Sequence, residues 1–195
     1  MRIGIFGGSF NPPHMGHLIV AEQAREKMGL GKVLFIPAAT PPHKQNLDIV
    51  EAHHRMEMME CAVHGNRYFE ASDIELQRGG LSFTVDTVAA LTQLYPEDSL
   101  VLLIGADNLL EFNTWREPER ILELVDVVAL SRPGFRMDGI DTGFRSSVSL
   151  CEVPLIDLAS SEIRRRVKEG KSIRYMVPVA VESYIVNQGL YLSNQ

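Results

Sequence analysis

The sequence predicts an α/β protein: a single-domain, doubly wound, mainly parallel sheet spanning residues 1–195, with further helices at the C-terminal end. Three observations lead to this prediction. Short apolar runs alternate with helix-length segments along the chain, as in βαβ units. The run at 99–104 is almost continuously apolar, which is typical of a strand buried on both faces of a parallel sheet. The length of 195 residues suits one domain with a sizeable core.

Six strands and at least six helices are expected. The predicted strands are 3–6, 32–37, 68–74, 99–104, 126–130 and 148–153, the last of them a central strand. The predicted helices are 18–28, 51–64, 82–95, 118–124, 160–168 and 178–187, with a further helical piece capped by 105–108. A turn is predicted at 77–80, and loops are predicted at 38–48 and 135–147. Right-handed crossovers would bring the carboxyl ends of the strands to one edge, where such sheets bind ligands.

Composition limits the possible partners. Hydrophobic residues make up 45% of the chain and charged residues 23%, which is ordinary for a globular protein. The net charge of −6 argues against a nucleic-acid or membrane partner. The chain has no apolar run of membrane-spanning length, no signal-peptide pattern, and only two cysteines. We therefore expect a cytoplasmic protein with small-molecule substrates, and the sequence leaves a homo-oligomer open.

A glycine-rich turn, which begins at Gly7 and ends at His17, joins the first predicted strand to the first predicted helix. Gly7 and Gly8 let a phosphorylated ligand approach the backbone closely. Asn11 precedes two prolines and is a candidate N-cap, and a helix N-terminus attracts anions. His14 and His17 are three residues apart, so in a helix they would share a face. Their imidazoles could donate hydrogen bonds to phosphate and carry charge when their pKa is raised, so the turn is predicted to bind phosphate.

Three other kinds of site fit this turn less well. A dinucleotide fingerprint needs a G-x-G-x-x-G spacing and an acid after the second strand, but the spacing differs and that strand ends in Ile36-Pro37. A Walker A loop needs Gly-Lys-Ser/Thr, which is absent. A zinc site needs Cys or carboxylate ligands near the two histidines, and none lies at ligand spacing in this stretch of sequence. No metal site is therefore predicted. A plain structural role at a helix start is the remaining alternative.

Polar residues also follow other predicted elements at the same edge. Lys44 lies in the loop after the second strand, where it is either a ligand cation or a solvated side chain. Asp107 can accept ribose hydroxyls or cap a helix. Trp115, the single tryptophan, is either core or a stacking surface for a ring. Ser160 and Arg164 open a helix, where the guanidinium fork suits phosphate and the serine suits a capping arrangement.

The segment from Gly8 to His17 resembles the (T/S)-x-x-H-x-G-H signature of the nucleotidyltransferase superfamily, and it is similar to the HIGH motif of class I aminoacyl-tRNA synthetases. Nearly the whole chain further resembles the bacterial nicotinate mononucleotide adenylyltransferases. The matching motifs are Pro37 to Lys44, Ser82-Phe83-Thr84, Ile104 to Asp107, Trp115 with Ser131 to Gly134, Leu158 to Arg164, and Tyr184 to Tyr191. Two positions depart: Ala159 stands where many members have serine, and Asn11 stands where aspartate is common.

The resemblance implies a Rossmann-like fold and transfer of the adenylyl group of ATP to nicotinate mononucleotide. The products would be nicotinate adenine dinucleotide (deamido-NAD) and pyrophosphate, in NAD biosynthesis, with Mg²⁺ carried by ATP. The implied catalytic residues are His14, His17, Lys44 and Arg164. The implied ATP-binding residues are Gly7, Gly8, Ser9, Phe10, His14, His17, Gly105, Asp107, Ser160, Ser161 and Arg164. The implied mononucleotide-binding residues are Ser82, Thr84, Trp115 and Arg132. Two rivals are a phosphopantetheine-type acceptor and a non-catalytic nucleotide-sensing module.

Overall fold

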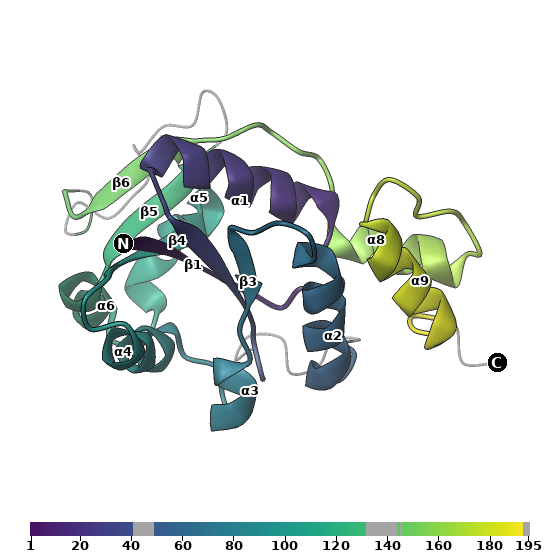
Figure 1. Cartoon of the computed structure of the whole chain (residues 1–195), viewed down its shortest axis with the longest axis horizontal. Helices are drawn as coiled ribbons and strands as arrows, with labels where there is room; N and C mark the ends of the chain where they lie inside the picture. The colour runs from purple at the N-terminus through teal and green to yellow at the C-terminus, as the bar shows by residue number, and fades with distance from the viewer. Residues whose placement is uncertain (41–48, 132–143, 145, 193–195) are drawn as a thin grey trace.

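A six-stranded parallel sheet with helices on both faces forms the centre of the molecule (Figure 1). The computed structural model describes residues 1–40, 49–131, 144 and 146–192. The strands are β1 (Arg2–Gly8), β2 (Lys32–Pro37), β3 (Phe69–Ala71), β4 (Ser99–Gly105), β5 (Asp126–Ser131) and β6 (Val148–Glu152). Their order is β3-β2-β1-β4-β5-β6, and every neighbouring pair is parallel. This is the doubly wound order of dinucleotide-binding folds, which confirms the predicted fold class.

The helices follow the predicted order. They are α1 (Met15–Met28), α2 (Ala52–Val63), α3 (Ile74–Arg78), α4 (Thr84–Leu94), α5 (Ala106–Leu110), the 3₁₀ helix η1 (Phe112–Thr114), α6 (Pro118–Leu124), α8 (Ser160–Lys168) and α9 (Val179–Asn187). Among the described residues, no helix combines the length and the apolar character that a membrane crossing requires.

Alternate side chains of each strand enter two separate apolar cores. On one face, strand residues such as Ile5 and Leu102 pack with α4 and α6. On the other face, residues such as Phe35 and Leu103 pack with α1 and α2, and α8 and α9 extend this second core. Because both faces are covered, the strands are apolar at nearly every position, which is why the sequence shows continuous apolar runs there.

Two predicted elements differ from the structure. The segment 68–74 is a strand only at Phe69–Ala71, and Ile74–Arg78 forms the helix α3 where a turn was predicted at 77–80. The amide side chain of Gln77 donates two 2.9 Å hydrogen bonds to the Asp73 carboxylate, and these stabilise this short helix. Strand β6 was expected in the centre but lies at the sheet edge, where it pairs with β5. The alternating chain adds strands outward from β1, so the last strand reaches an edge.

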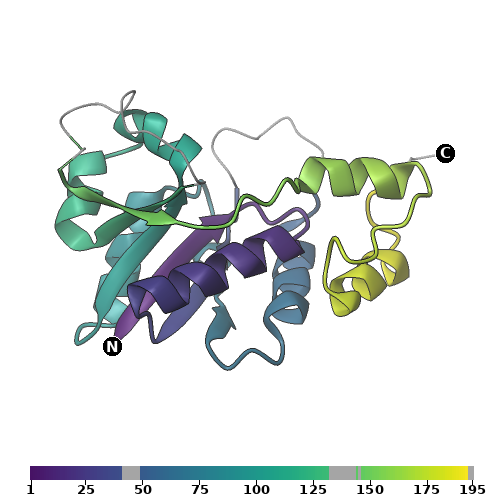
Figure 2. The same ribbon diagram turned by 90° about the horizontal axis from the view of Figure 1, so that it is seen from above.

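The C-terminal helices lie beyond the sheet, on the far side of α2 (Figures 1 and 2). After β6 the chain runs along α1, and α8 begins near the N-terminal end of α1 (Figure 2). Helix α9 then packs against α2. The predicted helices 160–168 and 178–187 are therefore confirmed, the second with its start shifted by one residue. This path returns the end of the chain to the turn between β1 and α1.

Candidate active site

The turn between β1 and α1 lies at the carboxyl edge of the sheet, and its histidines form a stacked pair. The His14 and His17 rings are 3.6 Å apart between centroids and inclined by 23°. The His14 backbone N–H donates a 3.1 Å hydrogen bond to His17 Nδ1, so Nδ1 is unprotonated and the neutral His17 ring carries its proton on Nε2. A Cβ at Gly16 would lie 3.1 Å from His14 Nδ1. The H-x-G-H spacing thus puts the smallest residue where the first ring packs.

Both imidazoles are neutral in the unliganded protein. Burial lowers the pKa of His14 to about 4. Burial also lowers the pKa of His17 well below its ordinary value, and the nearby His14 lowers it further. The condition under which these imidazoles would carry charge, a raised pKa, is therefore not met in the free protein, because the rings lie inside the fold instead of on a solvated helix face.

Asn11 is not the N-cap of α1. His14 occupies that position in an extended conformation, and α1 begins at Met15. The two prolines after Asn11 explain the delay, since a residue that precedes proline is disfavoured in helical conformation. The Asn11 side chain is buried instead, and its Oδ1 accepts hydrogen bonds from the Tyr191 hydroxyl at 2.8 Å and the Val50 N–H at 3.4 Å.

The start of α8 packs directly on this turn, as the sequence predicted for a shared site. Ser160 Oγ donates a 2.8 Å hydrogen bond to the Pro12 carbonyl. Arg164 Nη1 donates a 2.9 Å hydrogen bond to the Asn11 carbonyl. Ala159, not a serine, is the N-cap residue of α8, and Ser161 is exposed. The capping arrangement expected at Ser160 is therefore wrong, because its hydroxyl is used to hold the turn.

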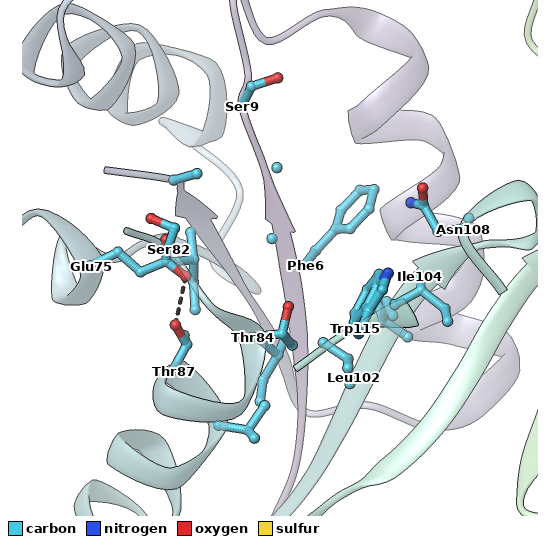
Figure 3. A pocket seen from close by; sticks show the side chains of 18 residues that line it. Phe6, Ser9, Glu75, Ser82, Thr84, Thr87, Leu102, Ile104, Asn108 and Trp115 are labelled. Carbon is cyan, nitrogen blue, oxygen red and sulfur yellow. Dashed lines mark hydrogen bonds between the residues drawn. The ribbon is translucent and has the colours of Figure 1, made fainter. Parts of the chain in front are cut away.

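A cavity of about 220 Å³ opens where β1 and β4 end; we call it the switch-point cavity. Adjacent parallel strands whose connections leave in opposite directions create such a crevice. Its lining includes the predicted ligand residues Gly7, Gly8, Ser9, Ser82, Thr84, Gly105 and Trp115. Figure 3 shows Thr84 and Trp115 around this space, with Phe6 and Ser9 from β1 and the turn that follows it. Residues from Ile5 to Trp115 are thus brought to one cavity.

Trp115 forms part of the wall of the switch-point cavity and is neither a free surface residue nor a fully buried one. It is half-buried, and its ring lies 5.3 Å from that of Phe112. It also lines an adjoining cavity with Phe83 and Arg116. One ring face is therefore supported by the core, which suits a stacking surface.

A second cavity of about 230 Å³, the β4–β5 cavity, lies beside the first and shares Phe6 and Gly105 with it. Its lining includes Asp107 and Ser131. Asp107 is exposed in the first turn of α5, and Gly105 is the N-cap of that helix, so the 105–108 prediction is confirmed in position. Together the two cavities provide an apolar-walled space along the ends of the central strands.

Other predicted site residues lie away from these walls or outside the described residues. Phe10 is buried, and its ring contacts Phe6 and His17 at centroid distances of 5.9 and 5.0 Å. Its side chain is therefore packed behind the turn. Lys44 and Arg132 lie outside the described residues. In the described part of the chain, no group of three His, Cys, Asp or Glu side chains is placed so that it could hold a metal ion.

Sequence reasoning missed Arg55, which is hydrogen-bonded to the β1–α1 turn. Its side chain is 1% exposed and donates to the carbonyls of Ser9, Ala39 and Val50, at 3.0, 3.0 and 3.1 Å. Burial lowers the pKa of its guanidinium, which nonetheless remains charged. In sequence it is one polar residue of an amphipathic helix, and no signal there marks it as buried.

Glu75 was missed as well. It was placed near a predicted turn, yet it is 6% exposed and lines the switch-point cavity. Its Oε1 accepts a 2.6 Å hydrogen bond from Thr87 Oγ1, drawn as a dashed line in Figure 3. Only the arrangement of α3 against α4 reveals this carboxylate.

The fold and the site together define a nucleotide-binding α/β class, and comparison with known proteins agrees. A family model for cytidylyltransferase-like proteins matches residues 5–166. This range includes the H-x-G-H turn, the strands that line the two cavities, and the start of α8. The chain belongs to this family and, within it, to the nicotinate-nucleotide adenylyltransferases. The resemblance of the motifs is thereby confirmed.

The relatives match over nearly their whole length. A probable nicotinate-nucleotide adenylyltransferase of Thermomicrobium roseum is 46% identical over 196 residues, covering 97% of this chain and 91% of that protein. A protein of the same description from Thermus thermophilus is 46% identical over 191 residues, covering 98% of this chain and 100% of its own.

Solved structures agree on the fold. The Plasmodium falciparum nicotinic acid mononucleotide adenylyltransferase complexed with NaAD aligns with a TM-score of 0.78 at 20% identity, over 97% of each chain. A putative nicotinate-nucleotide adenylyltransferase from Vibrio parahaemolyticus aligns with a TM-score of 0.73 at 23% identity, over 99% of this chain and 96% of its own.

Proposed function

We propose that the protein transfers the adenylyl group of ATP to nicotinate mononucleotide, forming nicotinate adenine dinucleotide and pyrophosphate in NAD biosynthesis. The observation that carries this function is that Phe6, which lines the switch-point cavity together with Thr84 and Trp115, lies 6.3 Å between ring centroids from His17 of the stacked histidine pair. Near full-length relatedness to nicotinate-nucleotide adenylyltransferases supports the choice of acceptor.

The reaction requires little covalent chemistry from the protein. An oxygen of the mononucleotide phosphate attacks the α-phosphorus of ATP, and the bond from that phosphorus to the pyrophosphate breaks. Because the attacking phosphate is already an anion, no strong general base is needed. Catalysis then consists of holding the two phosphates in line and stabilising the charge that develops.

His14 and His17 are assigned to the α-phosphate and the triphosphate. The neutral His17 ring offers an Nε2–H donor, since its Nδ1 is occupied by a backbone N–H. Binding of a triphosphate opposes the effect of burial on the imidazole pKa, so the bound nucleotide favours the protonated form. The pair thus gains charge when its anionic ligand is present.

Lys44 and Arg164 are assigned to the departing pyrophosphate. The hydrogen bond from Arg164 to the Asn11 carbonyl engages one of five guanidinium N–H groups, and phosphate can bind others. Magnesium would enter as part of the substrate, MgATP, bound mainly by the phosphate oxygens.

The remaining ligand residues divide between the two cavities. ATP is assigned to the β4–β5 cavity and the turn, with contacts from Gly7, Gly8, Ser9, Gly105, Asp107, Ser160 and Ser161, and from the backbone of Phe10, whose ring is buried. Nicotinate mononucleotide is assigned to the switch-point cavity, with contacts from Ser82, Thr84, Trp115 and Arg132. Both substrates are highly charged phosphate esters, so we place the reaction in the cytoplasm, where ATP is made and used.

Pyrophosphate release in the presence of MgATP tests this function, with a panel of acceptors that includes nicotinate mononucleotide and phosphopantetheine. We expect release only with a pyridine mononucleotide and an equal amount of dinucleotide, identified by mass. Preferred use of phosphopantetheine would assign a different acceptor to the same chemistry. ATP binding without pyrophosphate release from any acceptor would indicate a nucleotide-sensing module.

A further inference from the structure

One buried carboxylate in the wall of the switch-point cavity is incompletely paired. Glu75 Oε1 accepts its hydrogen bond from Thr87, but Oε2 is buried and has no hydrogen-bond partner among the described residues. The side chain is 6% exposed and contributes to the cavity lining. In Figure 3, Glu75 and Thr87 lie on one side of the cavity and Trp115 lies on the other.

The cations around Glu75 are engaged elsewhere. Arg78, one turn further along α3, donates a 3.1 Å hydrogen bond to Thr87 Oγ1. Arg55, whose charge is felt at Glu75, donates to three backbone carbonyls. In the part of the chain that the structure describes, no salt bridge ends on Glu75, and its side chain belongs to the lining of the cavity.

The rest of that cavity wall is largely apolar, with Ile5, Ile36, Val88 and Leu102 among its lining residues. A carboxylate in such surroundings is costly when it has no partner, and a nearby positive charge stabilises it strongly. The cavity therefore favours a flat ligand that carries positive charge.

We propose, on the basis of the proposed function, that Glu75 recognises the positive charge of the pyridinium ring of the mononucleotide. The ring nitrogen that is bonded to ribose carries a formal positive charge in every oxidised pyridine nucleotide. Glu75 attracts this charge, while Trp115 supports the face of the ring. Glu75 also repels the carboxylate of the nicotinate, so that this carboxylate turns toward the N-terminal end of α4 at Thr84. Glu75 is thus a determinant of both affinity and orientation.

The test compares two acceptors that differ only in ring charge. One is nicotinate mononucleotide, and the other is the C-nucleotide in which benzoate replaces the nicotinate ring, with the same carboxylate, ribose and phosphate. The ratio of kcat/KM for the two acceptors is measured at saturating MgATP. We expect Glu75→Gln to reduce this ratio by about tenfold or more, as for loss of a partly buried charge pair, and to leave the KM for ATP unchanged.

Two further variants separate recognition from structure. Glu75→Asp keeps the charge and should retain the preference for the charged ring. Glu70→Gln removes an exposed carboxylate from the nearby strand β3, outside the cavity lining, and should leave the ratio unchanged. Thermal melting of each variant without ligand establishes that it is folded before the ratio is compared.

If no adenylyl transfer is observed, calorimetry without ATP gives the ratio of the binding affinities for the two mononucleotides, which replaces the ratio of kcat/KM values. A wild-type protein that makes no dinucleotide would overturn the proposed function alone, because the binding ratio still reports on Glu75. An equal effect of Glu75→Gln on both acceptors, as from a hydrogen bond to ribose or a structural role, would overturn the role in charge recognition. So would an unchanged ratio in a folded Glu75→Gln variant.

Discussion

His14 and His17 show at the scale of single residues what spacing predicts and what it does not. Their separation by three residues correctly predicts a shared face, and the rings stack at 3.6 Å. Their charge state depends on burial, which results from the packing of the chain around the turn. The same limit applies to Glu75, whose Oε2 is buried and has no hydrogen-bond partner among the residues that the structure describes.

Replacement of His17 by alanine should lower turnover far more than stability. The side chain offers a donor to the reacting phosphates, and loss of one such donor typically costs on the order of a hundredfold in kcat. Steady-state kinetics and thermal melting of His17→Ala measure the two effects. A folded variant with near wild-type turnover would remove His17 from the mechanism.

Stability should decrease as pH falls from neutral, because His14 is buried in its neutral form. Its pKa is about 4 in the folded protein against an ordinary value of 6.5, so the unfolded chain takes up the proton first. Above about pH 6.5, His14 is neutral in both states and does not change the free energy of unfolding. Below that pH, the free energy of unfolding decreases by up to about 1.4 kcal/mol per pH unit until the folded pKa is reached.

Urea unfolding at about pH 7.5 and pH 5.5 checks this dependence. His14→Asn, which cannot titrate, should show a decrease in the free energy of unfolding that is smaller by about 1.4 kcal/mol than in the wild type. An equal decrease in both proteins would mean that His14 titrates normally when folded.

At the scale of structural elements, Arg55 connects three segments of the chain. Its guanidinium joins the end of β1 at Ser9 to residues on either side of the β2–α2 connection, Ala39 and Val50. Val50 in turn donates to Asn11, which places the segment before α2 and the β1–α1 turn in one hydrogen-bonded network. Local sequence patterns carry no information about such contacts between elements.

Lysine at position 55 should keep the charge but lose the three-way connection, since an ammonium group cannot reproduce the guanidinium fork. We expect Arg55→Lys to lower kcat by roughly tenfold, because a small displacement of reacting groups has a large effect on rate. Met59→Ala is the matched control, since Met59 is fully buried in the same helix and outside the network. If both variants lose stability and keep full turnover, Arg55 is only a core residue.

Most elements were predictable because their periodicity is clear. The long helices and the apolar strands β2, β4 and β5 appear at the predicted positions. The short segment 68–78 was misassigned because a brief apolar run does not distinguish a strand from a helix. The helix α3 that results is the element that carries Glu75.

At the scale of the whole molecule, the last described residues close the site. The Tyr191 hydroxyl donates to Asn11 Oδ1 across 180 residues of sequence, and its burial raises the pKa of that hydroxyl. Ser160 and Arg164 from α8 reach the same turn. The sequence indicated which motifs to expect at this edge of the sheet, but not that side chains of the C-terminal segment hydrogen-bond to the β1–α1 turn.

Tyr191→Phe should therefore reduce turnover severalfold with a small loss of stability. One hydrogen bond of about 1 kcal/mol corresponds to a melting shift of about 2–4 °C in a chain of this size. Tyr184→Phe is the matched control, since its hydroxyl lies 2.9 Å from His54 Nδ1, away from the turn. Similar melting shifts with reduced turnover only in Tyr191→Phe are the expected outcome, and equal turnover in both would contradict a role for the C-terminal connection.

The central claim is adenylyl transfer to a pyridine mononucleotide that bears an acid. Nicotinate and nicotinamide mononucleotides differ only in a carboxylate or an amide. The N–H groups at the start of α4 suit an anion, whereas an amide would present a donor to donors. Such a mismatch discriminates strongly. The direct measurement is kcat/KM for both mononucleotides with MgATP: we predict clear preference for the nicotinate form, and equal or better use of the nicotinamide form would contradict the account.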